Sequence, residues 1–285
     1  MINEKIALYS PPHAEITSYF EMIDFAKKYG IKNLEILSIL EFKKPDIEFA
    51  KKLREYADKN NIKIVCTSKG GNLVSDNIKE STETFKRYAD VAKILGSPYF
   101  HHTIVFEFAN PDKVLPYKDI YLKKGVKAAR EINEYGKSIG IETIIEEQGY
   151  IFNGINGVKY LTDEIKDVGI LADYGNIMMV EEKIEDFIPH FTNRIKHIHI
   201  KDFSIIPKEA DEKREEYYYT VNKNFVKSHN LGEGQVNFKK IHELLKKMGY
   251  NGYYSIEIDS EKSKDDINNY LKNVYYFNDL LNFYK

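Results

Sequence analysis

The sequence of 285 residues contains one cysteine, Cys66, and no tryptophan. A single thiol excludes an internal disulfide and is typical of a reducing compartment, so we expect a cytoplasmic location. No apolar stretch approaches the ~18 consecutive residues of a membrane span. The first ten residues also lack the apolar run of a signal peptide. We therefore expect no membrane partner.

The sequence also lacks an excess of charge of either sign. Its 42 Lys and Arg residues nearly balance 44 Asp and Glu residues, which gives a formal net charge of −2. Nucleic-acid-binding domains usually carry a basic face, so we expect no nucleic-acid partner. The 22 tyrosines provide apolar rings with polar tips, a composition that suits a small sugar-like ligand.

Strands and helices are predicted to alternate along the whole chain. Short apolar runs predict eight strands, at residues 5–9, 34–37, 62–66, 99–104, 141–146, 168–172, 194–203 and 253–258. Strands that alternate with helices favour a parallel sheet. Eight such units fit a single α/β domain over residues 1–285, a (β/α)8 TIM barrel. A doubly wound open sheet competes, but no Gly-x-Gly-x-x-Gly follows the first strand.

Local signals suggest helix boundaries. Asn77 and Glu80 have the spacing of a capping box at the start of a helix over 78–95. The glycines between 149 and 157 are expected in a loop that precedes a helix ending near residue 165.

The predicted strand 194–203, RIKHIHIKDF, carries unusual polar residues. His197, His199 and Lys201 share one face, where a buried strand usually shows only Val, Ile or Leu. Burying polar groups costs free energy unless each has a partner. The pattern indicates a site, although two core histidines bonded to the backbone would give the same pattern.

Polar side chains also follow four successive strands where each strand ends. In a barrel the carboxyl ends of the strands surround one mouth. Three carboxylates and one imidazole suit Mn²⁺ or Mg²⁺ and tolerate Co²⁺ or Zn²⁺. Without a cation the like charges would repel. We therefore expect one divalent metal ion bound by Glu146, Asp173, His199 and Glu257, with Glu147 as a rival for Glu146.

Five segments carry a resemblance to a known family. IIEEQG, GILADYGN, RIKHIHIKDF, LGEGQVNF and GYNGYYSIEID occur in this order between about residues 141 and 259. They resemble the xylose-isomerase-like barrel superfamily, which contains sugar isomerases and epimerases, inosose-type dehydratases and endonuclease IV. The resemblance implies the same four metal ligands. It favours Glu146 over Glu147, because the family's Glu-Asn-His tripeptide aligns with residues 146–148.

The resemblance implies a metal-dependent isomerase or epimerase of a sugar, ketose or polyol derivative. Glu146 and Glu257 would be its catalytic acid/base pair around an enediolate, although both could be metal ligands alone. A metal-dependent dehydratase of the inosose or ketoacid type is the alternative on this scaffold. A nuclease of the endonuclease IV type is disfavoured, because residues 201–203 replace its further histidine. A non-catalytic sugar-binding barrel would not need acid/base carboxylates.

Four residues are expected to contact the substrate. Relatives often place a histidine near the end of strand four, which we assign to His102 with His101 as a rival. Asn176 could orient a sugar hydroxyl, and Lys201 could stabilise an oxyanion or form a salt bridge. His229 precedes the LGEG turn and could reach the mouth, or it could be a solvated loop residue.

Two further features have open interpretations. Glu35 in strand two is expected to face the barrel interior and to pair with a cation there. The charged segment 204–230 is expected to be a lid over the site, a contact in a homo-oligomer, or an exposed excursion.

Overall fold

The computed structural model describes residues 1–9, 15–107, 110–209, 218–258 and 266–283. Eight parallel strands close into a barrel in the order β1-β11-β7-β6-β5-β4-β3-β2, which confirms the predicted fold. The strands are β1 (Ile6–Tyr9), β2 (Asn33–Leu37), β3 (Lys63–Lys69), β4 (Tyr99–His102), β5 (Glu142–Glu146), β6 (Gly169–Asp173), β7 (Ile195–Ile200) and β11 (Tyr253–Ile256).

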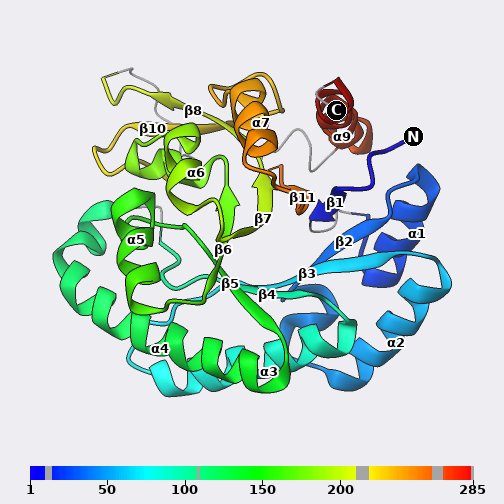
Figure 1. Ribbon diagram of the computed structural model, residues 1–285, viewed down its shortest axis with the longest axis horizontal. Helices are drawn as coiled ribbons and strands as arrows, with labels where there is room; N and C mark the ends of the chain where they lie inside the picture. Colours follow the sequence, from blue (N-terminus) through cyan, green and yellow to red (C-terminus); the bar gives the residue numbers. More distant parts are fainter. Residues whose placement is uncertain (10–14, 108–109, 210–217, 259–265, 284–285) are drawn as a thin grey trace.

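Helices surround this barrel (Figure 1). They are α1 (Tyr19–Tyr29), α2 (Ile47–Lys59), α3 (Ile78–Leu95), α4 (Lys118–Ile139), α5 (Gly154–Glu164), α6 (Ile184–Phe191), α7 (Phe238–Lys247) and α9 (Ile267–Phe283). Short 3₁₀ turns lie at η1 (Leu40–Lys43), η2 (Pro111–Lys113), η3 (Leu115–Tyr117) and η4 (Asn176–Val180). In the described parts of the chain, no helix has the length and apolar character needed to cross a membrane.

Helix starts follow local capping, with two corrections to the sequence prediction. The Ser18 side chain accepts a hydrogen bond from the backbone of Glu21, and the two residues form a capping box at α1. Asn77 precedes α3 but makes no side-chain cap, because its backbone (φ −92°, ψ 39°) is not extended like that of a usual N-cap. The expected capping box with Glu80 is therefore wrong.

The glycine-rich segment after β5 is helical earlier than expected. Asn153 caps α5 by accepting a hydrogen bond from Gly154 N, so Gly154 and Gly157 lie in the helix and not in a loop. A side chain at Gly157 would collide with the backbone oxygen of Ile151. Gly157 therefore allows α5 to pack closely against the preceding loop, and it does not form a turn.

Side chains of the barrel strands alternate between an inner and an outer face. Cys66, Ile144 and Leu171 form a small apolar layer inside the barrel. Residues of the outer faces, such as Phe100 and Ile198, join the main core beneath the helices. Towards the carboxyl ends of the strands the inner layer becomes polar, and its buried members are Glu35, Ser68, His101, Glu146, Asp173, His197 and His199.

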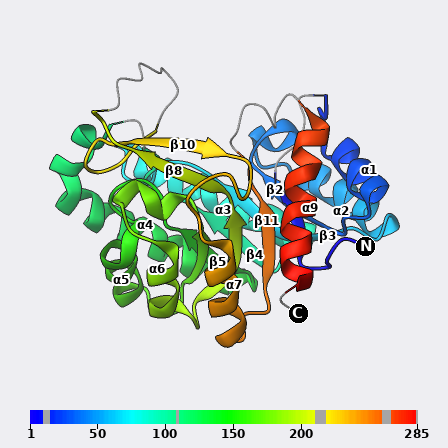
Figure 2. The ribbon, with the colours of Figure 1, turned by 90° about the horizontal axis from the view of Figure 1, so that it is seen from above.

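The chain after β7 forms a separate three-stranded sheet of β8 (Asp202–Ile206), β9 (Tyr218–Tyr219) and β10 (Phe225–His229). Figure 2 shows β8 and β10 side by side across one end of the molecule. Tyr150 Oη donates a hydrogen bond to the backbone oxygen of Tyr219 at 2.7 Å, which ties the sheet to the loop after β5. Residues 210–217 of the expected lid segment lie outside the described residues, and a lid role stays a prediction.

Candidate metal centre

Four of the predicted residues converge at the carboxyl ends of their strands. Glu146 ends β5, Asp173 ends β6, His199 lies in β7, and Glu257 directly follows β11. One ligand atom from each lies within 4.8 Å of the other three. The side chains of Asp173 and His199 are fully buried, and that of Glu257 is 12% exposed. The barrel therefore brings together three carboxylates and one imidazole from four successive barrel strands.

The imidazole nitrogen Nδ1 of His199 is at the centre of this cluster. It lies 2.9 Å from Glu257 Oε2, 3.3 Å from Glu146 Oε1 and 3.7 Å from Asp173 Oδ2. His199 Nδ1, Asp173 Oδ2 and Glu257 Oε2 are buried and make no hydrogen bond of good geometry within the described residues. Buried polar atoms that face one another without such bonds suit the ligand shell of a cation.

The electrostatics of the cluster also fit a divalent cation. Burial raises the pKa of Asp173 to about 7; Lys201 opposes this shift, while Glu257 and Glu146 add to it. Like charges at this separation are stabilised by an ion of opposite charge. Hard oxygen ligands with one imidazole are a donor set that Mn²⁺ or Mg²⁺ accepts. The residues present therefore fit such an ion.

Strand alternation separates Glu146 from its rival Glu147. Glu146 faces the cluster, whereas Glu147 Oε1 accepts the backbone N–H of Asp173. Burial raises the pKa of Glu147 well above its usual range, with the Asp173 carboxylate adding to the shift. Glu147 is therefore a buried group that supports the backbone of β6, and Glu146 takes the position in the cluster.

The same alternation reverses the expectation for the two histidines of β4. His101 faces the barrel interior, where its Nε2 lies 3.3 Å from Glu146 Oε2. His102 lies on the outer face, and its ring packs against Phe85 of α3 and Phe100 at centroid distances of 5.7 and 5.8 Å. The structure thus corrects the assignment of His102 as a substrate contact, because a neighbouring strand position points to the opposite face.

Asn176 and Lys201 both contact cluster carboxylates. Asn176 Nδ2 donates a hydrogen bond to Glu146 Oε1 at 2.9 Å. Lys201 Nζ donates to Glu257 Oε1 at 2.8 Å and lies 3.1 Å from Asp173 Oδ2. The expected alternative for Lys201, a salt bridge to a loop carboxylate, is replaced by ion pairs inside the site.

His229 is not among the four converging side chains. It lies in β10 opposite Asp202 in the register of the three-stranded sheet. The separation between its Nε2 and Ser204 Oγ is 2.7 Å, which makes a hydrogen bond within that sheet. Contact between His229 and a substrate stays a prediction.

Sequence reasoning missed Tyr9 at the site. Tyr9 ends β1, and its ring packs edge-on against the ring of His199 with centroids 4.8 Å apart. Burial, with the charges of Glu257 and Glu146 adding, raises the pKa of Tyr9 well above its usual range. A polar tip at the end of an apolar strand was the available signal, because the same position on later strands carries the cluster residues.

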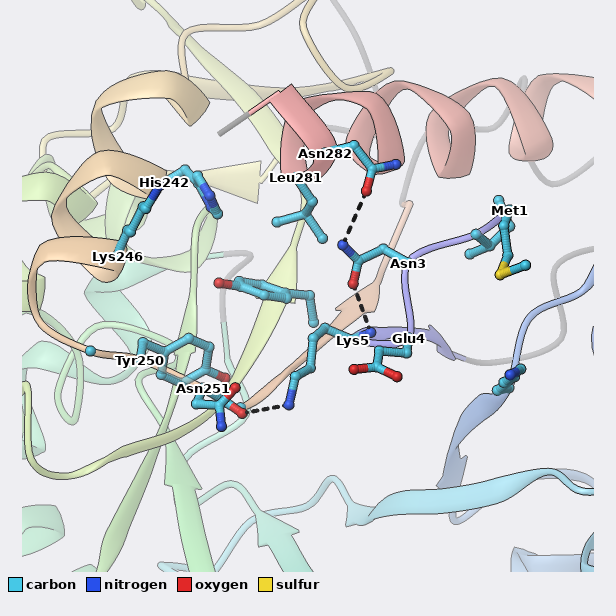
Figure 3. Close-up of a pocket in the computed structure, with 15 residues that line it drawn as sticks. Met1, Asn3, Glu4, Lys5, His242, Lys246, Tyr250, Asn251, Leu281 and Asn282 are labelled. Carbon is cyan, nitrogen blue, oxygen red and sulfur yellow. Dashed lines mark hydrogen bonds between the residues drawn. The ribbon is translucent and has the colours of Figure 1, made fainter. Parts of the chain in front are cut away.

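A pocket of about 650 Å³ lies at the opposite end of the barrel (Figure 3). It is lined by residues that precede β1, β2 and β11 and by parts of α7 and α9. Lys5 Nζ donates there to the backbone oxygen of Asn251 at 3.0 Å. None of the four cluster residues lines this pocket. The cluster instead lies at the carboxyl ends of the strands, where TIM barrels place their chemistry.

Comparison with known proteins gives a family match over most of the chain. A family model described as xylose isomerase-like TIM barrel matches residues 23–278. An inosose dehydratase from Lacticaseibacillus casei is 30% identical over 112 residues, which cover 39% of this chain and 36% of that protein. An inosose dehydratase from Geobacillus thermodenitrificans is 27% identical over 212 residues, 66% of each chain. The match to the first of these relatives therefore spans about a third of its length.

Solved structures share the fold at low sequence identity. A xylose isomerase domain protein from Planctomyces limnophilus has a TM-score of 0.73 and 15% identity, with 97% of this chain and 96% of that chain covered. A xylose isomerase-like TIM barrel protein from Mycobacterium smegmatis in complex with magnesium has a TM-score of 0.72 and 15% identity, with 98% of this chain and 97% of that chain covered. D-psicose 3-epimerase from Clostridium cellulolyticum H10, with D-tagatose, has a TM-score of 0.72 and 17% identity, with 98% of this chain and 97% of that chain covered.

Proposed function

The chain belongs to the xylose isomerase-like TIM barrel family, and from this premise we propose that it is a metal-dependent isomerase or epimerase of a sugar, ketose or polyol derivative. The observation that carries the proposal is the convergence of Glu146, Asp173, His199 and Glu257 within 4.8 Å. These residues would hold one divalent ion, with Mn²⁺ or Mg²⁺ preferred and Co²⁺ or Zn²⁺ tolerated. When bound, the ion supplies a Lewis acid that polarises a substrate carbonyl.

Glu146 is suited to accept a proton from the carbon beside that carbonyl. Burial raises its pKa, but the neighbouring rings of His101 and His199 outweigh burial and hold the pKa below its usual range in the protein without a metal ion. Glu146 is therefore ionised, as a general base must be. Asn176 Nδ2 bonds its Oε1 at 2.9 Å and fixes the carboxylate plane.

Glu257 is the proposed partner that returns a proton. Its Oε1 is bonded by Lys201 Nζ at 2.8 Å, so an ammonium group lies beside the place where oxyanion charge would develop. Proton removal by one carboxylate and return by the other converts the substrate through an enediolate without gain or loss of atoms. The contrasting assignment makes both glutamates metal ligands only, with water moving the proton.

A metal-dependent dehydratase is the second candidate. The relatives from Lacticaseibacillus casei and Geobacillus thermodenitrificans are inosose dehydratases, and this likeness is the observation that favours it. The same proton removal would then be followed by loss of a β-hydroxyl as water. Lys201, whose Nζ lies 2.8 Å from Glu257 Oε1, would donate the proton that this leaving group needs.

Deuterium exchange tests both candidates together. The protein with Mn²⁺ is incubated in D₂O with a panel of ketoses and an inosose, and products are analysed by NMR and mass spectrometry. Carbon-bound deuterium in a product of unchanged composition supports the isomerase or epimerase, whereas loss of one water supports the dehydratase. Glu147→Gln should keep the activity and Glu146→Gln should lose it. No exchange by metal-loaded protein across the panel would contradict the proposal.

A further inference from the structure

Glu35 of β2 is a fully buried carboxylate that contacts two histidines of β7. Its Oε2 lies 3.0 Å from His199 Nε2 and 3.0 Å from His197 Nε2. Its Oε1 lies 3.1 Å from His199 Nε2 and accepts a hydrogen bond from Ser68 Oγ. A buried carboxylate needs such donors, and Glu35 takes them from the residues behind the cluster.

These contacts fix which nitrogen of His199 carries the proton. A neutral imidazole has one N–H and one bare nitrogen. Because Glu35 only accepts hydrogen bonds when ionised, His199 Nε2 must be the donor. The other nitrogen, Nδ1, is the one 2.9 Å from Glu257 Oε2 and inside the cluster. In the neutral form of His199, the form that binds a metal ion, Glu35 therefore leaves the Nδ1 lone pair facing the place where the ion would bind.

The same carboxylate orients a second histidine through Ser68. Ser68 gives its only hydroxyl proton to Glu35, so its oxygen is left to accept from His101 Nδ1, which lies 2.9 Å away. That bond turns the other nitrogen of His101 towards Glu146 Oε2, at 3.3 Å. Glu35 thus sets the orientation of two rings that face different members of the cluster.

We propose that Glu35 is a positioning residue for the metal centre, holding His199 as the Nε2–H tautomer with Nδ1 free to bind the ion. The inference rests on the proposed metal centre and deepens it. Carboxylates that accept the second N–H of a metal-bound histidine typically contribute 10–100-fold to metal affinity. A space-filling role for Glu35 would affect folding stability and would leave metal affinity unchanged.

The first experiment compares Mn²⁺ binding to folded variants by titration calorimetry. Glu35→Gln keeps the side-chain volume but replaces one acceptor oxygen with an NH₂ group, which cannot accept from a histidine. It should weaken Mn²⁺ binding by roughly 10–100-fold. Ser255→Ala is the matched control, because Ser255 Oγ lies 2.8 Å from His197 Nε2 in the same buried layer. This variant should bind Mn²⁺ as the wild type does.

The second experiment does not depend on a variant. Nitrogen-15 NMR of the wild type loaded with diamagnetic Zn²⁺ should show His199 protonated at Nε2 alone. Equal Mn²⁺ affinity for wild type and Glu35→Gln would overturn the role of Glu35 and leave the metal centre standing. A proton at Nδ1 in the Zn²⁺-loaded protein would overturn both the role of Glu35 and the assignment of His199 as a ligand. A wild type that binds neither ion would instead remove the metal centre itself, and this inference with it.

Discussion

Replacing His102 with leucine tests the placement of this residue on the outer face of β4. The side chain is fully buried against Phe85 and Phe100. Burial lowers the pKa of His102 from its ordinary 6.5 to about 3. The folded protein therefore keeps this imidazole neutral at pH values where an exposed histidine is protonated.

The size and sign of the effect of His102 on the free energy of unfolding follow from this pKa. Below about pH 6.5 the unfolded chain binds a proton at His102 that the folded chain does not bind until about pH 3. The free energy of unfolding therefore falls as the pH falls through this window. At pH 5 the loss attributable to His102 is about 2 kcal/mol, from 1.36 kcal/mol per pH unit.

Urea denaturation at pH 7 and pH 5 measures this contribution. His102→Leu should lose about 2 kcal/mol less stability than the wild type between these two pH values. His190→Leu removes an exposed imidazole from α6 and shows the effect of losing any histidine. If His102→Leu and the wild type had the same pH dependence, His102 would not be held neutral, and its burial against α3 would be wrong.

Three further variants test contacts around the cluster and at the turn over residues 232–236. Lys201→Met keeps an apolar stem but removes the ammonium group from the cluster carboxylates, so kcat should fall roughly 10²–10³-fold while calorimetry shows Mn²⁺ still bound. Gly175→Ala places a Cβ about 2.5 Å from Lys201 Cγ, and overpacking should cost about 1–3 kcal/mol in urea denaturation. Asp202→Ala removes the acceptor for three backbone N–H groups of residues 232–236. It should destabilise by about 1–3 kcal/mol and speed proteolysis at this turn.

Much of the fold could be predicted because local patterns agree with the global arrangement. The predicted helix over 78–95 has the same bounds in the structure. Gly154 and Gly157 were wrongly predicted to lie in a loop. Glycine occurs both in turns and where helices pack closely, and the sequence alone does not distinguish the two cases. The three-stranded sheet after β7 was also missed, since β8 begins only two residues after β7 ends and β9 has only two residues.

The convergence of Glu146, Asp173, His199 and Glu257 was predictable because each of them lies at or near the end of an apolar strand body. His102 was chosen wrongly because two histidines are adjacent, and a register shift of one residue exchanges the two faces. The neighbouring residues do not separate the two, because an aromatic residue stands two positions before each histidine, Tyr99 before His101 and Phe100 before His102. The role of Glu35 could not be predicted, because its partner His199 is 164 residues away along the chain and only barrel closure brings them together.

Elemental analysis of the purified protein tests the metal centre most directly. The wild type, Glu257→Gln and Glu147→Gln are each dialysed against Mn²⁺ and then against metal-free buffer. Glu147→Gln is the matched control, because Glu147 Oε1 accepts the backbone N–H of Asp173 and a glutamine oxygen can accept the same bond. About one divalent ion per chain in the wild type and control, lost in Glu257→Gln, is the expected result. No retained metal in any of the three proteins, or equal retention in all three, would contradict a metal centre built on Glu257.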